Sequence, residues 1–261
     1  MKLTDNAIEY INRMAGGKAG ESALAKTDPE FYERFMNFAY DEVVNEEGWQ
    51  LDDRMRFISI LAVLLGCQGI DEFKVNVPAA LNFGVTPVEI KEIVYQANDY
   101  LGMGRIFQFL LAVNEIFRER GIELPLEPQG TTTMEDRLAK GNQVQIDAFG
   151  EGMRERWLDG PEEMRHINRW LASNCFGDFY TRTGLSIADR ELITFCFIYA
   201  QGGAESQLAG HVNGNLNVGN DRHKLISVVS QCIPYIGYPR SLNAVRVVQE
   251  VSAQREAAER G

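Results

Sequence analysis

Hydrophobic positions along the chain follow the periodicity of helices from one end to the other. Between residues 192 and 200 apolar side chains run almost without interruption, as on a helix that is buried on all sides. Between residues 204 and 218 they recur every four positions, at Leu208, Val212 and Leu216, which places them on one helix face. No stretch of useful length alternates apolar and polar residues, so no strand is expected. The pattern predicts an all-α protein.

Residues that start helices divide this pattern into elements. The stretch TPVE at 86–89 puts Thr86 at an N-cap and Glu89 three positions later, with a proline at the first helical position, and this predicts a capping box. The stretch TDPE at 27–30 has the same form and predicts a second one. Pro239 is expected to begin a last helix that runs to near the C-terminus.

The chain contains two copies of one helical unit. LNFG at 81–84 matches LNVG at 216–219, and the two leucines lie 135 residues apart. The same spacing relates four further identical pairs, which are Gln96 and Gln231, Tyr100 and Tyr235, Gly102 and Gly237, and Arg105 and Arg240. This many matches in register indicate a duplication, with copies over roughly residues 30–120 and 165–255.

The duplication sets the domain organisation. We assign residues 1–125 to an N-terminal repeat and residues 134–261 to a C-terminal repeat, each with about four main helices. The stretch LPLEPQGTTT at 124–133 is interpreted as the linker, because it combines two prolines with three threonines. Residues 134–184 are expected to form a helical segment that leads into the second copy.

Composition narrows the possible partners. A net charge of −11 repels phosphate backbones and anionic lipids, so neither nucleic acid nor a membrane is an expected partner. Local arginines can still reverse the field within a pocket, so an anionic substrate stays possible. The longest apolar stretch, at 58–67, is too short to cross a bilayer, and no signal peptide is recognisable at the N-terminus, which favours the cytoplasm. The four cysteines lack a CxxC pair and are expected to be free.

One histidine distinguishes the two copies. His211 precedes LNVG in the second copy, and Asn76 occupies the matching place in the first. A lone histidine is often a buried side chain that is hydrogen-bonded to a neighbour. A purely structural need would apply to both copies, however, so the difference favours a role in proton transfer.

Two glutamates are candidate partners for this histidine. Glu191 is the stronger candidate, because Arg56 or Phe57 stands at its place in the first copy. Glu205 lies six positions before His211, on a different face of the same expected helix. A favourable charge at a helix N-terminus is an alternative explanation for Glu205.

The sequence resembles the carboxymuconolactone decarboxylase family, which includes the alkylhydroperoxidase D-like proteins. The resemblance rests on DRELI at 189–193, His211, LNVG at 216–219, PYIGYPR at 234–240, and the stretch at 81–105 in the first copy, while residues 134–141 look like the decarboxylase branch. His211 matches the family's histidine, and Glu191 lies near the position of its glutamate. The family implies an all-helical fold whose single-repeat members often form hexameric rings. A tandem chain is then expected to be a homo-oligomer, a trimer with six repeats.

The resemblance also implies an activity. The expected enzyme is a lyase that decarboxylates a small anionic organic acid, a lactone, without a metal or an organic cofactor. His211 would donate and accept the proton with Glu191 as its partner, and Arg190 or Arg240 would hold the substrate carboxylate. A surface ion pair is an alternative role for Arg190. The occurrence of Arg105 at the place of Arg240 favours a role in the fold or in an interface.

Two other functions stay open. The peroxidase branch of the family places a CxxC seven and four residues before the histidine, where this chain has Ala204 and Gln207, so the second copy cannot run that dithiol cycle. In the first copy Gly69 and Glu72 stand there, and Cys67 lies two residues away. Cys67 would then be a lone redox thiol, although a buried cysteine is the favoured interpretation. The third possibility is a non-catalytic oligomeric protein that binds small molecules.

Overall fold

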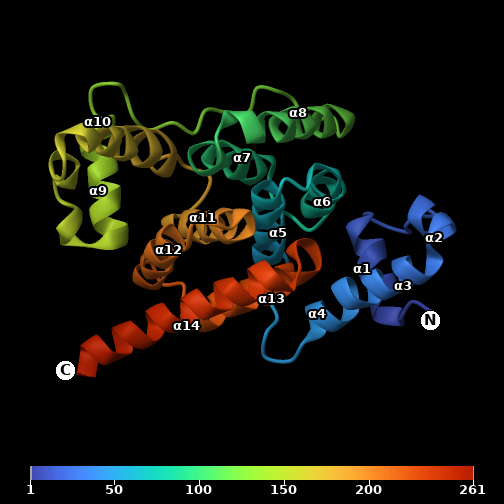
Figure 1. The fold of residues 1–261 in the computed structure, drawn as a ribbon. Helices are drawn as coiled ribbons and strands as arrows, with labels where there is room; N and C mark the ends of the chain where they lie inside the picture. The colour runs from blue at the N-terminus through green and yellow to red at the C-terminus, as the bar shows by residue number, and fades with distance from the viewer. Residues whose placement is uncertain (1, 261) are drawn as a thin grey trace.

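The computed structural model describes residues 2–260, which form helices and connecting loops without any β-strand (Figure 1). The first half consists of α1 (Asp5–Met14), α2 (Ala23–Thr27), α3 (Pro29–Asn37), η1 (Phe38–Glu42), α4 (Val43–Asn45), α5 (Asp53–Cys67), α6 (Ile70–Asn82), α7 (Pro87–Leu101) and α8 (Met103–Glu119). The second half consists of α9 (Arg137–Phe149), η2 (Glu151–Met153), η3 (Arg156–Leu158), α10 (Glu162–Trp170), η4 (Leu171–Tyr180), α11 (Ile187–Gln201), α12 (Glu205–Asn217), α13 (Arg222–Ile236) and α14 (Tyr238–Arg260). The predicted all-α fold with tandem helical repeats is confirmed.

The two repeats share one core. Helices α5–α8 and α11–α14 follow each other in the same order, and α5 packs along α11 at the centre of the molecule (Figure 1). Gly66 makes this contact possible, because a Cβ there would lie 2.8 Å from both the Ala200 Cβ and the Phe197 carbonyl oxygen. Helix α7 of the first repeat also packs on α11, and α13 of the second packs on α5. Each repeat therefore has one helix that packs against the central helix of the other repeat.

Two buried arginines show this exchange at the atomic level. Arg56 and Arg190 each stand four positions after the N-cap of their helix, and each is almost fully buried. Arg56 donates to the Gln231 side chain at 2.9 Å, and Arg190 donates to the Gln96 side chain at 2.8 Å. In both cases the glutamine comes from the other repeat. Equivalent hydrogen bonds therefore hold α13 against α5 and α7 against α11.

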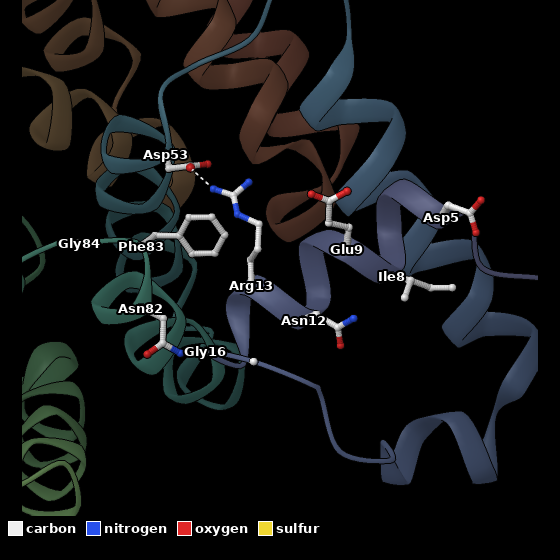
Figure 2. Close-up of a pocket in the computed structure, with 11 residues that line it drawn as sticks. Asp5, Ile8, Glu9, Asn12, Arg13, Gly16, Asp53, Asn82, Phe83 and Gly84 are labelled. Atoms are coloured by element: carbon white, nitrogen blue, oxygen red, sulfur yellow. Dashed lines mark hydrogen bonds and ion pairs between the residues drawn. The ribbon is translucent and has the colours of Figure 1, made fainter.

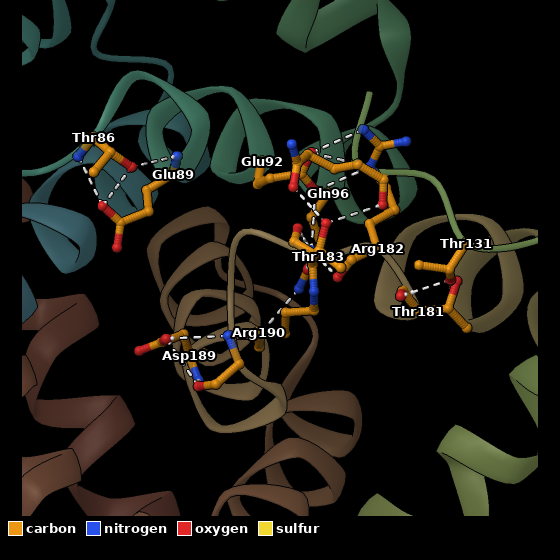
Figure 3. A network of polar contacts seen from close by, with 12 residues as sticks. Thr86, Glu89, Glu92, Gln96, Thr131, Thr181, Arg182, Thr183, Asp189 and Arg190 are labelled. Carbon is orange, nitrogen blue, oxygen red and sulfur yellow. Dashed lines mark hydrogen bonds and ion pairs between the residues drawn. The ribbon is translucent and has the colours of Figure 1, made fainter. Parts of the chain in front are cut away.

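The predicted helix ends are met in part. The Thr86–Glu89 capping box is present, with the Thr86 side chain and the Glu89 carboxylate each accepting from the other's backbone N–H (Figure 3). The second predicted capping box, at 27–30, is wrong. Thr27 is the last residue of α2, and its hydroxyl donates to the Asp28 carboxylate at 2.6 Å, so α3 starts at Pro29 without a side-chain cap. The last helix begins one residue before the expected Pro239.

The segment between the repeats is helical from α9 onwards, as expected, and residues 124–133 contain no helix. Helix α9 packs tightly on the π-helix η4. Glycines allow this approach, because a Cβ at Gly141 would overlap the carbonyl oxygen of Ala172, and one at Gly177 would overlap that of Arg137. Within residues 2–260, no helix combines the length and the apolar character that a membrane crossing requires.

We predict that Gly141→Ala destabilises the protein. The added methyl group would press against backbone atoms that cannot rotate away, so we expect a loss of about 1–3 kcal/mol or more in the free energy of unfolding. Gly104→Ala is the matched control, since Gly104 lies in α8 with nothing near its Cβ position, and should be neutral or stabilising by about 0.5–1 kcal/mol. Urea unfolding of the two variants measures the difference, and equal midpoints would contradict the proposed close contact.

Candidate active site

One cavity of about 730 Å³ lies where the two repeats meet. Its wall is made by residues of α7, α9, η2, η3, η4, α11 and α12, and aromatic and aliphatic side chains such as Phe149, Phe176 and Ile198 dominate it. The side chains with polar groups in the lining are Asp99, Tyr100, Gln145, Arg156, Gln201, Gln207 and His211. An apolar cavity with a few polar groups is the usual form of a small-molecule site.

His211 and Glu191 meet at this cavity. The His211 Nδ1 lies 2.9 Å from the Glu191 Oε2, although the residues are 20 positions apart. The glutamate side chain is fully buried on α11, and the histidine side chain, on α12, keeps 13% of its surface exposed at the cavity wall. A carboxylate can only accept, so we assign Nδ1 as the donor to it, which leaves Nε2 for a ligand.

A chain of hydroxyl groups holds the other oxygen of Glu191. Tyr180 of η4 donates to Glu191 Oε1 at 2.8 Å, and the hydroxyls of Thr194 and Tyr100 lie 2.8 and 3.0 Å from the Tyr180 oxygen. Burial raises the pKa of both Tyr180 and Tyr100 well above the ordinary value, so both stay neutral. The carboxylate is thereby fixed on two sides.

The imidazole ring is positioned by packing as well. His211 makes edge-to-face contacts with Tyr100 and Phe149, each with ring centroids 5.5 Å apart. Gly214, one turn further along α12, leaves room for the acid, because a Cβ there would overlap the Glu191 carboxylate and lie 2.6 Å from the Phe149 ring. The His211–Glu191 pair therefore has little freedom to separate.

The first repeat has no such pair. Counted from the helix N-caps, Phe57 takes the place of Glu191, and it is fully buried. Asn76, which matches His211, is buried too and donates to the Glu72 backbone oxygen at 2.9 Å. The asymmetry seen in the sequence is thus an asymmetry of the two structures.

Arg190 does not belong to the cavity lining. Its guanidinium group is fully buried, donates to Glu92 at 3.0 Å and to Gln96, and also bonds the backbone oxygens of Arg182 and Thr183 (Figure 3). The sequence left a surface ion pair open as an alternative role for Arg190. The ion pair is present, but it lies in the interior of the protein. Because both terminal nitrogens of its guanidinium group are hydrogen-bonded inside the protein, Arg190 holds α11 against α7 and is not available to a substrate.

Arg240 and Glu205 also lie outside the lining. Arg240 donates to the backbone oxygen of Ala200 near the end of α11. Glu205 is the exposed first residue of α12 and accepts from Asn243 at 3.0 Å, which fits its alternative role at a helix N-terminus. The arginine that does line the cavity is Arg156 of η3. No motif surrounds it in the sequence, so only the fold identifies it.

Cys67 lacks the environment of a reactive thiol. It is half-buried on α5, its Sγ donates to the Leu64 backbone oxygen at 3.7 Å, and burial raises the pKa of its thiol. All four cysteines are free. Ala204 and Gln207, at the places where the peroxidase branch has cysteines, both line the cavity beside His211.

Another cavity, of about 810 Å³, lies between α1 and α6 (Figure 2). Arg13 reaches across it to Asp53, at 2.5 Å, with its guanidinium carbon 4.5 Å from the centre of the Phe83 ring. The lining contains no histidine or cysteine. Among residues 2–260 no group of three or more His, Cys, Asp or Glu side chains is placed to hold a metal ion. The His211 cavity is therefore the candidate active site.

We predict that Cys67 reacts slowly with electrophiles at neutral pH. A raised thiol pKa leaves little thiolate, so iodoacetamide should label Cys67 more slowly than it labels a free cysteine measured in parallel. Mass spectrometry reports the labelling, with the unfolded chain as the control in which all four cysteines react. Rapid labelling of Cys67, or its conversion to a sulfenic acid by peroxide, would restore the redox alternative.

Comparison with known proteins agrees with the fold. The model of the carboxymuconolactone decarboxylase family matches the chain twice, over residues 29–115 and 166–250. A 4-carboxymuconolactone decarboxylase of Acinetobacter baylyi is 26% identical over 118 residues, which cover 45% of this chain and 87% of that protein. A crystal structure from Burkholderia xenovorans LB400, described as a candidate gamma-carboxymuconolactone decarboxylase subunit, has a TM-score of 0.53 at 18% identity and covers 97% of this chain and 96% of its own, which shows a common fold. Because the family model covers more than half of the chain, in both repeats, this protein belongs to the carboxymuconolactone decarboxylase family.

Proposed function

We propose that this protein decarboxylates a small organic acid lactone by proton transfer, without a cofactor. The observation that carries the proposal is the His211–Glu191 hydrogen bond at the wall of a largely apolar cavity. The family relationship supports the reaction class, and the Acinetobacter baylyi relative, a 4-carboxymuconolactone decarboxylase, supports the lactone substrate.

The reaction requires one proton and no net change of oxidation state. The bond between a ring-system carbon and the carboxylate breaks, and its electron pair moves into the conjugated lactone carbonyl. Carbon dioxide leaves, and a proton must then reach carbon to give the product lactone. Protonated His211 can deliver this proton from Nε2 and regain it from water, because imidazole exchanges protons near neutral pH.

Glu191 makes the imidazole a better proton carrier. Its carboxylate holds Nδ1 in one tautomer and stabilises the positive charge of the imidazolium that forms during the cycle. The apolar surroundings strengthen this attraction, because little water competes for either group. Tyr180 fixes the carboxylate from the other side, so the pair stays aligned while the proton moves.

Arg156 is the group that we propose for holding the substrate carboxylate. It is the one arginine or lysine in the cavity lining as the structure describes it. A guanidinium group can bind a carboxylate through two parallel hydrogen bonds, which would orient an anionic lactone toward His211. Arg156 therefore replaces Arg190 and Arg240 in this role.

We predict that His211→Ala lowers kcat for carboxymuconolactone by about 10²–10⁴-fold, the usual contribution of a general acid. Glu191→Gln should lower it by a smaller factor, because the imidazole stays in place but loses the stabilising charge. Loss of substrate absorbance measures both rates. His223→Ala is the control, since that histidine stacks on Trp49 at 4.6 Å and does not line the cavity. A His211→Ala rate equal to wild type would end the proposal.

We also propose that the chain forms a homo-oligomer through two equivalent apolar surfaces. Met103, Phe107 and Leu111 follow each other at every fourth position on α8, and each is at least half exposed. On α14, Tyr238 and Leu242 stand 135 residues after Met103 and Phe107 and are exposed to 57% and 63%. Exposed apolar groups at equivalent places of both repeats fit a symmetric assembly, as in a trimer with six repeats.

Light scattering coupled to size exclusion tests this assembly. We expect the wild type to elute with about three times the 29.4 kDa mass of one chain. The double variant Phe107→Glu/Leu242→Glu should shift toward a monomer, because it places charges in both apolar surfaces. Met134→Glu serves as the control, since Met134 is 72% exposed but lies outside α8 and α14. A monomeric wild type would contradict the prediction.

A further inference from the structure

A second carboxyl group reaches the cavity from the first repeat. Asp99 lies in the last turn of α7, next to Tyr100, and lines the same cavity as His211. Its Oδ2 is buried and has no hydrogen-bond partner. A buried carboxyl oxygen without a partner is costly for the fold, particularly when it is charged. A group of this kind in a cavity wall is a candidate for chemistry.

The groups around Asp99 include no cation that is paired with its carboxyl group in the part of the chain that the structure describes. Its neighbours in the cavity wall and in the packed elements are Cys175, Asp178 and Tyr180 from η4, Glu191 from α11, His211 from α12, Arg156 from η3, and Tyr100 on its own helix. No lysine, arginine or histidine within residues 2–260 forms an ion pair with Asp99, and nearby Asp178 is already paired with Arg137 at 2.5 Å. Burial raises the pKa of Asp99 to about 7; the side chains of Asn98 and Cys175 lower it by a smaller amount, and the negative charge of Asp178 raises it.

Asp99 also distinguishes the two repeats. The residue that matches it in the second repeat, 135 positions later, is Pro234, just as Asn76 matches His211. The first repeat thus has the carboxyl group and no imidazole at these places, and the second repeat has the imidazole and no carboxyl group. Because α7 packs on both α11 and η4, the two groups come to one cavity.

We propose that Asp99 is a second catalytic residue, which in its neutral form donates a hydrogen bond to the lactone carbonyl oxygen of the substrate. This inference rests on the proposed decarboxylation. Negative charge develops on that oxygen as carbon dioxide leaves, and a donor in an apolar site stabilises it strongly. The proton of Asp99 is shared and then returns, while His211 delivers the proton that ends on carbon. The reaction therefore stays balanced with one proton consumed from water.

The neutral state of Asp99 is what makes this role possible. An ionised aspartate would repel both the substrate carboxylate and the developing oxyanion, whereas a neutral carboxyl group has an O–H to donate. The partnerless oxygen and the absence of a paired cation both disfavour the ionised state. A carboxyl donor in the wall thus complements the imidazole without competing for its proton.

The test compares Asp99→Asn, Asp99→Ala and the wild type in carboxymuconolactone turnover between about pH 5 and about pH 9. The wild type should lose activity as the pH rises through about 7, where Asp99 loses its proton. Asp99→Ala should lose about 10²–10³-fold in kcat near pH 6, as for loss of an oxyanion donor. Asp99→Asn keeps an N–H donor, so it should stay within about tenfold of the wild type. Its decline at alkaline pH should be less steep, because proton loss from His211 then acts without proton loss from Asp99.

Folding and specificity have separate controls. The pKa of Asp99 is higher in the folded than in the unfolded chain, so its contribution to stability is lost as the pH rises toward about 7. Asp99→Asn should therefore raise Tm over the wild type more at about pH 8 than at about pH 5, which also shows that the variant folds. Asp147→Asn removes an exposed carboxylate of α9 outside the lining and should leave turnover unchanged.

The outcomes separate this inference from the proposed function. If Asp99→Ala turns over like the wild type while His211→Ala does not, the role of Asp99 is overturned and the decarboxylation stands. If Asp99→Asn is as slow as Asp99→Ala, or declines as steeply at alkaline pH as the wild type, the hydrogen-bond donor role is overturned. If the wild type does not turn over carboxymuconolactone, both the proposed decarboxylation and the role of Asp99 are overturned.

Discussion

The packing of α7 against α11 is the contact on which the candidate site depends. It joins a helix of the first repeat to the helix that carries Glu191, and it brings Tyr100 and Asp99 to the wall beside His211. Arg54 of α5 reinforces it, because its guanidinium bonds Glu89 of the α7 capping box at 2.6 Å and Asp189 of the α11 capping box at 3.0 Å. Without this contact, neither repeat alone would enclose the cavity.

Most charged groups at the contact between α7 and α11 are paired with a group of opposite charge or hydrogen-bonded. Glu92 on α7 accepts from both Arg190 and Arg182, and Gln96 bonds both the guanidinium and the backbone oxygen of Arg190 (Figure 3). Removal of one partner from such a buried network leaves an uncompensated charge and typically costs about 3–5 kcal/mol. The network also fixes the position of the residue that follows Arg190, which is Glu191. Stability of the contact and geometry of the acid–imidazole pair therefore depend on the same groups.

Local sequence patterns were sufficient to predict the helices, because periodicity and the Thr86 cap are encoded over short distances. The duplication and the pairing of His211 with Glu191 were predicted by comparing two copies 135 residues apart and from the family resemblance. Local patterns were misleading for Arg190. A charged residue beside a catalytic candidate suggests substrate binding, and its burial depends on Glu92, which lies 98 positions away. The capping box expected at 27–30 fails for a similar reason, since Thr27 belongs to the preceding helix. Asp99, Arg156 and Tyr180 reach the site only through helix packing, which no local pattern records.

The first copy lacks the acid–imidazole pair because other side chains occupy the same places in its core. In the first repeat Phe57, at the place of Glu191, packs against Phe83 with ring centroids 4.8 Å apart, and Arg56 lies buried with donors to Tyr10 and the Ala39 backbone. Aromatic rings that fill this volume contribute to the core, and an open, partly polar cavity does not. A single-repeat protein would have to provide both a filled core and a partly polar cavity with one copy of the sequence. A tandem chain can place a buried phenylalanine in one copy and an acid and an imidazole in the other, and α7 then carries Asp99 from the first copy to the cavity beside His211.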